Sequence, residues 1–136
     1  MVYSITVHED AETDLDRIWE LDEDVAADII ALLEQAENDQ TLLDMLTVKD
    51  FGVHGTEKIH VDKWVAQHKQ GRNLWRLKIW ELEDRGIRYR IIYALDPRCS
   101  RYHVLGILER DFDYVANDDR TRRVLAAYDE LGIPNY

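Results

Sequence analysis

Five cationic residues in the C-terminal half of the chain have types and spacing that suit chemistry on a phosphate. Arg76 and Lys78 lie two residues apart in LWRLKIWELE, and Arg88 and Arg90 repeat this spacing in IRYRIIYALD. Arg110 ends a third stretch of the same kind, RYHVLGILER. Guanidinium groups bind phosphate oxygens through two parallel hydrogen bonds, and an ammonium group among other cations loses its proton more readily. The set could therefore form an anion-binding surface.

The three stretches read as β-strands that would bring these cations together. Successive side chains of a strand point to opposite faces. The two arginines of 87–96 therefore fall opposite Tyr89 and Ile91, and the two cations of 74–83 fall opposite Leu77. On neighbouring strands they would make a concave basic face, with Phe112 and Tyr114 at its rim.

A simpler interpretation remains open for the same pattern. The cations could cover the solvated face of a half-exposed sheet, with their stems on apolar surface and their charges in water. Glu81, Glu83 and Asp84 could neutralise several of them. The pattern alone therefore supports an anion-binding surface without establishing one.

Periodicity along the rest of the chain predicts an α+β fold. Residues 2–7 alternate as a strand, 8–22 and 23–37 have the spacing of two amphipathic helices, and 118–131 have that of a last helix. Turn residues divide 74–110 into a three-stranded antiparallel meander. We expect the N-terminal strand to join the meander in one mainly antiparallel sheet, with the helical hairpin on one face. Residues 38–73 are harder to assign: 41–46 could continue the hairpin or form a short third helix, and 60–71 could be strand, helix or loop.

Composition limits the class of protein. The 136 residues suit a single domain over 1–136, and one cysteine, Cys99, excludes an internal disulfide and favours a reducing cytosol. The N-terminus lacks the pattern of a signal peptide, and no apolar run is long enough for a bilayer. We therefore expect a cytoplasmic protein without a membrane partner.

Charge is unevenly distributed along the chain. Residues 1–57 hold 2 basic and 16 acidic residues, whereas 58–110 hold 12 basic and 6 acidic residues. The formal net charge of −11 would disfavour nucleic acid. A phosphate responds mainly to charges within a Debye length, about 8–10 Å, so the basic segment could still bind one.

Histidines offer no recognised metal pattern. His54, His60 and His68 lie six and eight residues apart, with Asp62 nearby, and none of these spacings is a known ligand signature. We expect no metal and no cofactor. Alternation puts His103 on the face of Leu105 and Ile107, which favours a core histidine.

Residues 74–114, LWRLKIWELEDRGIRYRIIYALDPRCSRYHVLGILERDFDY, resemble the core of the RelE/ParE-type toxins of bacterial toxin–antitoxin pairs. The shared pattern is a strand with alternating cations, a turn, a strand with a hydrophobic–Arg–hydrophobic–hydrophobic–Tyr run, and a strand ending in a basic corner. The run Ala11–Leu15 also looks like the first helix of that family. The resemblance covers about 2–35 and 74–116, and 38–73 look like an insertion in a RelE/ParE-like domain.

This resemblance implies a metal-independent endoribonuclease that cuts mRNA, commonly on the ribosome, and binds a cognate antitoxin. Lys78 matches the base, Arg90 the phosphate-holding arginine and Arg110 the arginine at the end of the last strand. Tyr114 lies near a tyrosine that some members use, although closer to Arg110 than expected. RNA binding would fall to the two remaining cations, Arg76 and Arg88.

Two other functions remain open. The family includes proteins that share the fold, lack the nuclease residues and inhibit DNA gyrase, and fold does not decide activity. An inactive member of such a cassette is the third reading, and it predicts harmless expression.

Overall fold

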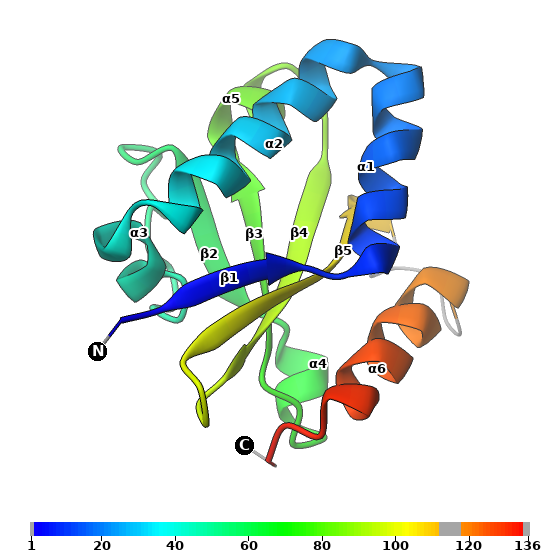
Figure 1. Cartoon of the computed structure of the whole chain (residues 1–136). Coiled ribbons are helices and arrows are strands. Elements are labelled where there is room, and N and C mark those ends of the chain that lie inside the picture. The colour runs from blue at the N-terminus through cyan, green and yellow to red at the C-terminus, as the bar shows by residue number, and fades with distance from the viewer. Residues whose placement is uncertain (1, 112–117, 135–136) are drawn as a thin grey trace.

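The computed structural model describes residues 2–111 and 118–134, and they form the α+β fold that the sequence predicts (Figure 1). In chain order the elements are β1 (Ser4–Val7), α1 (Glu9–Leu21), α2 (Glu23–Glu37), α3 (Gln40–Met45), β2 (Ile59–Lys63), α4 (Val65–His68), β3 (Leu74–Ile79), α5 (Trp80–Asp84), β4 (Tyr89–Asp96), β5 (Arg101–Glu109) and α6 (Asp119–Leu131). The predicted N-terminal strand, helical hairpin, meander and C-terminal helix are all confirmed.

The described strands make one mixed sheet in the order β1-β5-β4-β3-β2. The pairs β2–β3, β3–β4 and β4–β5 are antiparallel. The N-terminal strand joins the meander as expected, and it runs parallel to β5. The sheet is therefore mainly antiparallel, with the cation-bearing strands β3 and β4 in its interior.

One face of the sheet is covered by the helical hairpin. Asp22 both ends α1 and caps α2, because its carboxylate accepts hydrogen bonds from the N–H groups of Asp24 and Val25. The tight turn packs the apolar sides of both helices on the sheet (Figure 1). No helix among the described residues is long and apolar enough to cross a membrane. The strand residues buried on the hairpin face include Ile59, Val61, Leu77, Ile91, Tyr93 and Tyr102.

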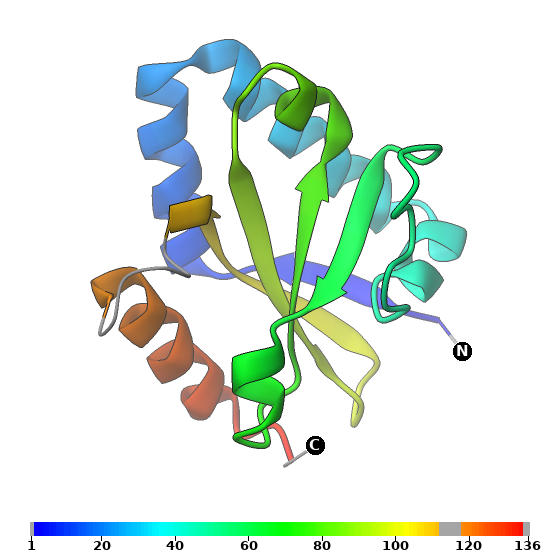
Figure 2. The same cartoon turned by 180° about the vertical axis from the view of Figure 1, so that it is seen from behind.

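The opposite face is divided into two zones. Helix α6 packs on part of it, where Val124 and Tyr128 contact a cluster that includes Leu74 and Ile92. In Figure 2, α1 and α2 lie behind the strands, and no helix crosses in front of the middle of β2 and β3. The sheet therefore carries an apolar zone under α6 and an uncovered zone beside it.

A β-bulge sets the boundary between these zones. Opposite Ile92 and Tyr93, strand β5 supplies Gly106 and Val104, so Leu105 is an extra residue without a partner. The bulge reverses the alternation beyond it, and Leu105 packs under α6 while Ile107 packs under the hairpin.

The bulge also corrects the expectation for His103. The predicted shared face with Ile107 is wrong, because strict alternation does not continue through Leu105. His103 is half-buried, and its Nδ1 atom lies 3.3 Å from the hydroxyl oxygen of Thr6 in β1. It is a partner of the edge strand β1.

One region differs from its sequence interpretation, and a second, which the sequence left undecided, is assigned by the structure. The strand expected over 74–83 ends at Ile79, and Trp80–Asp84 form the short helix α5. The alternation of Trp80 and Leu82 with glutamates fits one helical turn as well as a strand. Residues 38–73 supply α3, α4 and β2, and β2 extends the sheet beside β3. Their description as an insertion stays a prediction.

Asp14 connects α1, β5 and α6 beside the part of β5 that does not pair with β1. Its buried carboxylate accepts a hydrogen bond of 2.9 Å from the backbone N–H of Ile107 in β5. The same carboxylate pairs with the guanidinium of Arg123 in α6 at 2.5 and 3.0 Å. Helix α1 is thus tied to the bulged strand and to the helix on the other face.

We expect Asp14→Ala to lower the free energy of unfolding by about 2–3 kcal/mol, because it leaves a buried N–H and a guanidinium without their acceptor. Chemical denaturation measures this change. The matched control is Asp16→Ala on the exposed side of the same helix, which should change stability by less than about 0.5 kcal/mol. Equal effects of the two substitutions would contradict the role of Asp14.

Candidate functional site

A pocket of about 320 Å³ opens on the uncovered zone of the sheet. Its floor is the face of β2, β3 and β4 opposite the hairpin, and α5 and the end of β5 form its sides. The lining comprises five cations, two carboxylates, a histidine and one apolar residue: Arg76, Lys78, Arg88, Arg90, Arg110, Asp62, Glu83, His60 and Leu77. We call this set of residues the basic pocket.

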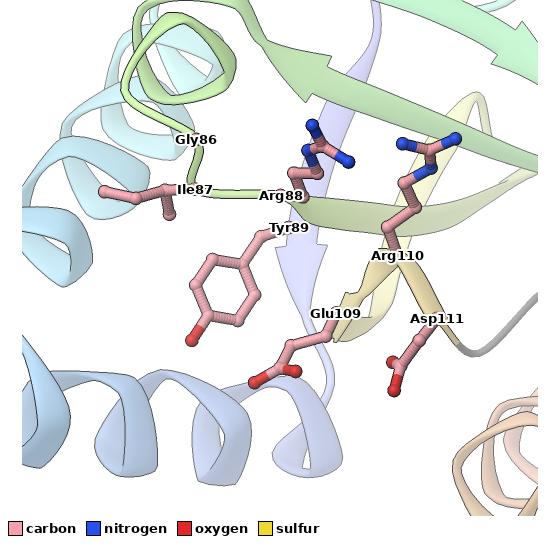
Figure 3. Close-up of a pocket in the computed structure, with 7 residues that line it drawn as sticks. All are labelled: Gly86, Ile87, Arg88, Tyr89, Glu109, Arg110 and Asp111. Atoms are coloured by element: carbon pink, nitrogen blue, oxygen red, sulfur yellow. The ribbon is translucent and has the colours of Figure 1, made fainter.

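Strand pairing explains the convergence of the cations. Arg76 lies opposite Ile92 in the β3–β4 ladder, and Lys78 follows on the same side of β3. The N–H of Arg110 donates to the carbonyl of Arg88 at 2.8 Å, which continues the β4–β5 ladder past its last strand pair. Figure 3 shows the side chains of Arg88 and Arg110 pointing to the same side, away from Tyr89 and Glu109.

A second hollow, of about 500 Å³, continues from the basic pocket along the ends of β4 and β5. Arg88 and Arg110 line both spaces. Tyr89 and Glu109 point to the side opposite Arg88 and Arg110 (Figure 3). The pKa of the Tyr89 hydroxyl is raised, mainly by burial and secondly by the negative charge of Glu109. The two hollows therefore adjoin at Arg88 and Arg110.

Arg90 is held by a carboxylate from within the pocket. Its guanidinium makes an ion pair with Glu83 of α5 and donates to the carbonyl of Tyr89 at 3.1 Å. Both partners of the ion pair are largely buried. One of the three carboxylates that the simpler interpretation named is therefore a partner of the site, and it fixes the orientation of Arg90.

Lys78 has the electrostatic environment of a base. Burial lowers the pKa of its ammonium most, and Arg90, Arg110 and Arg76 lower the pKa further by charge repulsion. Glu83 acts in the opposite direction. The Nζ atom lies 4.6 Å from the ring centroid of Trp80. The lysine is thus positioned over an aromatic ring, and its proton is easier to remove than that of an exposed lysine.

The acidic helices do not enter the basic pocket. Its lining comes from β2, β3, α5, β4 and the chain next to β4 and β5, while α1 and α2 lie across the sheet. The charge imbalance of the sequence is thus partly a separation in space, because the acidic helices α1 and α2 cover one face of the sheet and the five cations of the basic pocket line the other. This separation lets a basic site exist in a protein of net charge −11.

Five of the six predicted site residues line the basic pocket, and Tyr114 lies outside the described residues. Sequence reasoning missed the contributions of β2 and α5, namely His60, Asp62 and Glu83. The signal for β2 was present in IHVDK, where Ile59 and Val61 alternate with His60 and Asp62. Within residues 2–111 and 118–134, no group of three or more potential metal ligands gathers.

Comparison with known proteins adds no relative. No protein-family model matches the chain, and no curated protein or solved structure matches it significantly. The resemblance to the RelE/ParE toxins therefore remains a prediction from the sequence.

We expect Glu83→Gln to lower the pKa of Lys78 further. The carboxylate of Glu83 stabilises the ammonium form of Lys78 and neutralises Arg90, and the substitution removes both effects. Titration of the lysine Nζ resonance by NMR measures this. Glu81→Gln, an exposed change on the same helix, is the control and should leave the resonance unmoved. A pKa that rises or stays constant in Glu83→Gln would show that this carboxylate does not govern the lysine.

Proposed function

We propose that the protein is a metal-independent endoribonuclease that cleaves RNA by attack of a ribose 2′-hydroxyl on the adjacent phosphate. The observation that carries the proposal is the convergence of four arginines around Lys78 in one pocket. Five cations face two carboxylates there, so the pocket attracts an anion. The depressed pKa of Lys78 adds a base to the anion site.

Each reacting atom has a counterpart among these residues. The neutral amine of Lys78 takes the proton of the 2′-hydroxyl, and the oxygen forms a bond to phosphorus as the bond from phosphorus to the 5′-oxygen breaks. Arg90 and Arg110 balance the negative charge that develops on the non-bridging oxygens. The 5′-oxygen leaves with a proton, giving a 2′,3′-cyclic phosphate and a 5′-hydroxyl end.

Arg76 and Arg88 suit contacts to the phosphates on either side of the cleaved one. Arg88 is exposed and lines both hollows, so it can contact a chain that runs from one into the other. Single-stranded RNA, which has a free 2′-hydroxyl and a flexible backbone, is the matching substrate class. Following the family resemblance, we propose mRNA as the cellular substrate and a cognate antitoxin as the partner.

One observation favours a second candidate function. Because Glu83 already pairs with Arg90, the pocket could act as a docking surface without catalysis. A toxin-fold protein that binds and inhibits a protein target such as DNA gyrase would need no base. The two candidates differ in whether RNA is cut.

We expect the purified protein to cut a synthetic RNA in the presence of EDTA, and Lys78→Met to slow cleavage by about 10²–10⁴-fold because the base is lost. Arg90→Ala should cost about 10²–10³-fold through lost charge stabilisation. Rates follow from gel analysis of labelled RNA, with Lys69→Ala and Arg101→Ala as exposed controls. Cleavage of an all-DNA oligonucleotide at the same rate would contradict attack by the 2′-hydroxyl.

In a bacterial host we expect expression to arrest growth with loss of intact mRNA, detected by primer extension. The double variant Arg90→Ala, Arg110→Ala should relieve the arrest, since both phosphate contacts are gone. A double variant as toxic as the parent would exclude the nuclease account. DNA damage signalling with intact mRNA would favour the gyrase inhibitor instead.

A further inference from the structure

His60 is the one histidine that lines the basic pocket, and the cleavage step above does not use it. It lies on β2 directly opposite Lys78 of β3. Side chains directly opposite on antiparallel strands have Cβ atoms about 5 Å apart and point to the same face. The base and an imidazole are therefore neighbours on the floor of one pocket.

The imidazole ring is fixed by contacts on two sides. It stacks on the indole of Trp80 with a centroid distance of 5.7 Å and an interplanar angle of 1°. The indole N–H in turn donates to the carbonyl of Gly52 at 2.8 Å. Gly52 has a positive φ of 76°, and a Cβ there would lie 1.9 Å from the carbonyl oxygen of Ile59, so the loop fits closely against β2.

Asp50 orients the ring through one of its nitrogens. Its carboxylate lies 3.5 Å from Nε2 of His60, and its backbone N–H donates to the carbonyl of Val61 at 2.9 Å. The described residues give Nδ1 no hydrogen-bond partner, and the side chain is 14% exposed. Asp50 is thus the carboxylate neighbour of one ring nitrogen, and the histidine itself lines the basic pocket.

We propose that His60 is a catalytic acid that protonates the leaving 5′-oxygen, and that Asp50 is a positioning residue for its ring. The proposal rests on the proposed function. As the bond from phosphorus to the 5′-oxygen breaks, its electron pair goes to the oxygen, which takes the Nδ1 proton of the imidazolium. Lys78 ends protonated and His60 neutral, and exchange with water restores both.

The chemistry of the other residues supports this assignment. The arginines keep their protons throughout the range in which enzymes work, so they stabilise charge but make poor proton donors. A carboxylate beside one imidazole nitrogen fixes the orientation of the ring, as in other oriented histidines.

A substrate with sulfur in place of the 5′-bridging oxygen tests the proposal, because a thiolate leaves without protonation. We expect His60→Ala to cut ordinary RNA about 10²–10³-fold more slowly than the parent and the 5′-phosphorothiolate RNA within a few-fold of the parent. Asp50→Asn should show a smaller loss with the same rescue. His54→Ala, an exposed histidine, is the control and should match the parent on both substrates.

The two substrates separate the possible failures. A parent protein that cuts neither RNA removes the proposed function and this inference with it. A parent that cuts RNA, with a His60→Ala variant that matches it or loses both substrates equally, overturns the inference alone. If thermal melting shows that His60→Ala is unfolded at the assay temperature, His60→Gln, which keeps a donor toward Asp50, takes its place under the same criteria.

Discussion

The site depends on side-chain alternation along three paired strands. Because Trp75, Leu77 and Ile91 are buried under the helical hairpin, the residues between them must point to the other face. That constraint gathers Arg76, Lys78 and Arg90 although their like charges repel one another. A one-residue slip of either strand would bury the cations and expose the core, so the apolar face holds the charges in place.

The second constraint is the division of the other face. Helix α6 is held over one part of the sheet by its packing on the extra residue Leu105 and by the ion pair between Asp14 and Arg123. Gly106 takes part because a Cβ there would lie 3.1 Å from the side chain of Val124. The helix therefore completes an apolar layer at one end, while the remainder of the face stays open for the basic pocket.

The sequence predicts the elements with strong periodicity and misses those that tertiary contacts decide. The alternation through Arg88 and Arg90 was sufficient to locate β4 and its cations. Nothing local distinguishes Trp80–Asp84 as a helical turn from the end of a strand, or marks Leu105 as an extra residue. The approach of Asp50 to His60 depends on how a glycine-bearing loop packs on β2, which periodicity does not encode.

The central claim is that these cations bind one RNA backbone together. The most direct test is an NMR titration of the arginine Nε–H and lysine Nζ resonances with a short 2′-O-methyl RNA, which cannot be cut. The account predicts saturable shifts at Lys78, Arg90 and Arg110 that weaken steeply with salt, and none at Arg98 or Arg101. Shifts spread evenly over all arginines, or absent from these three residues, would contradict it.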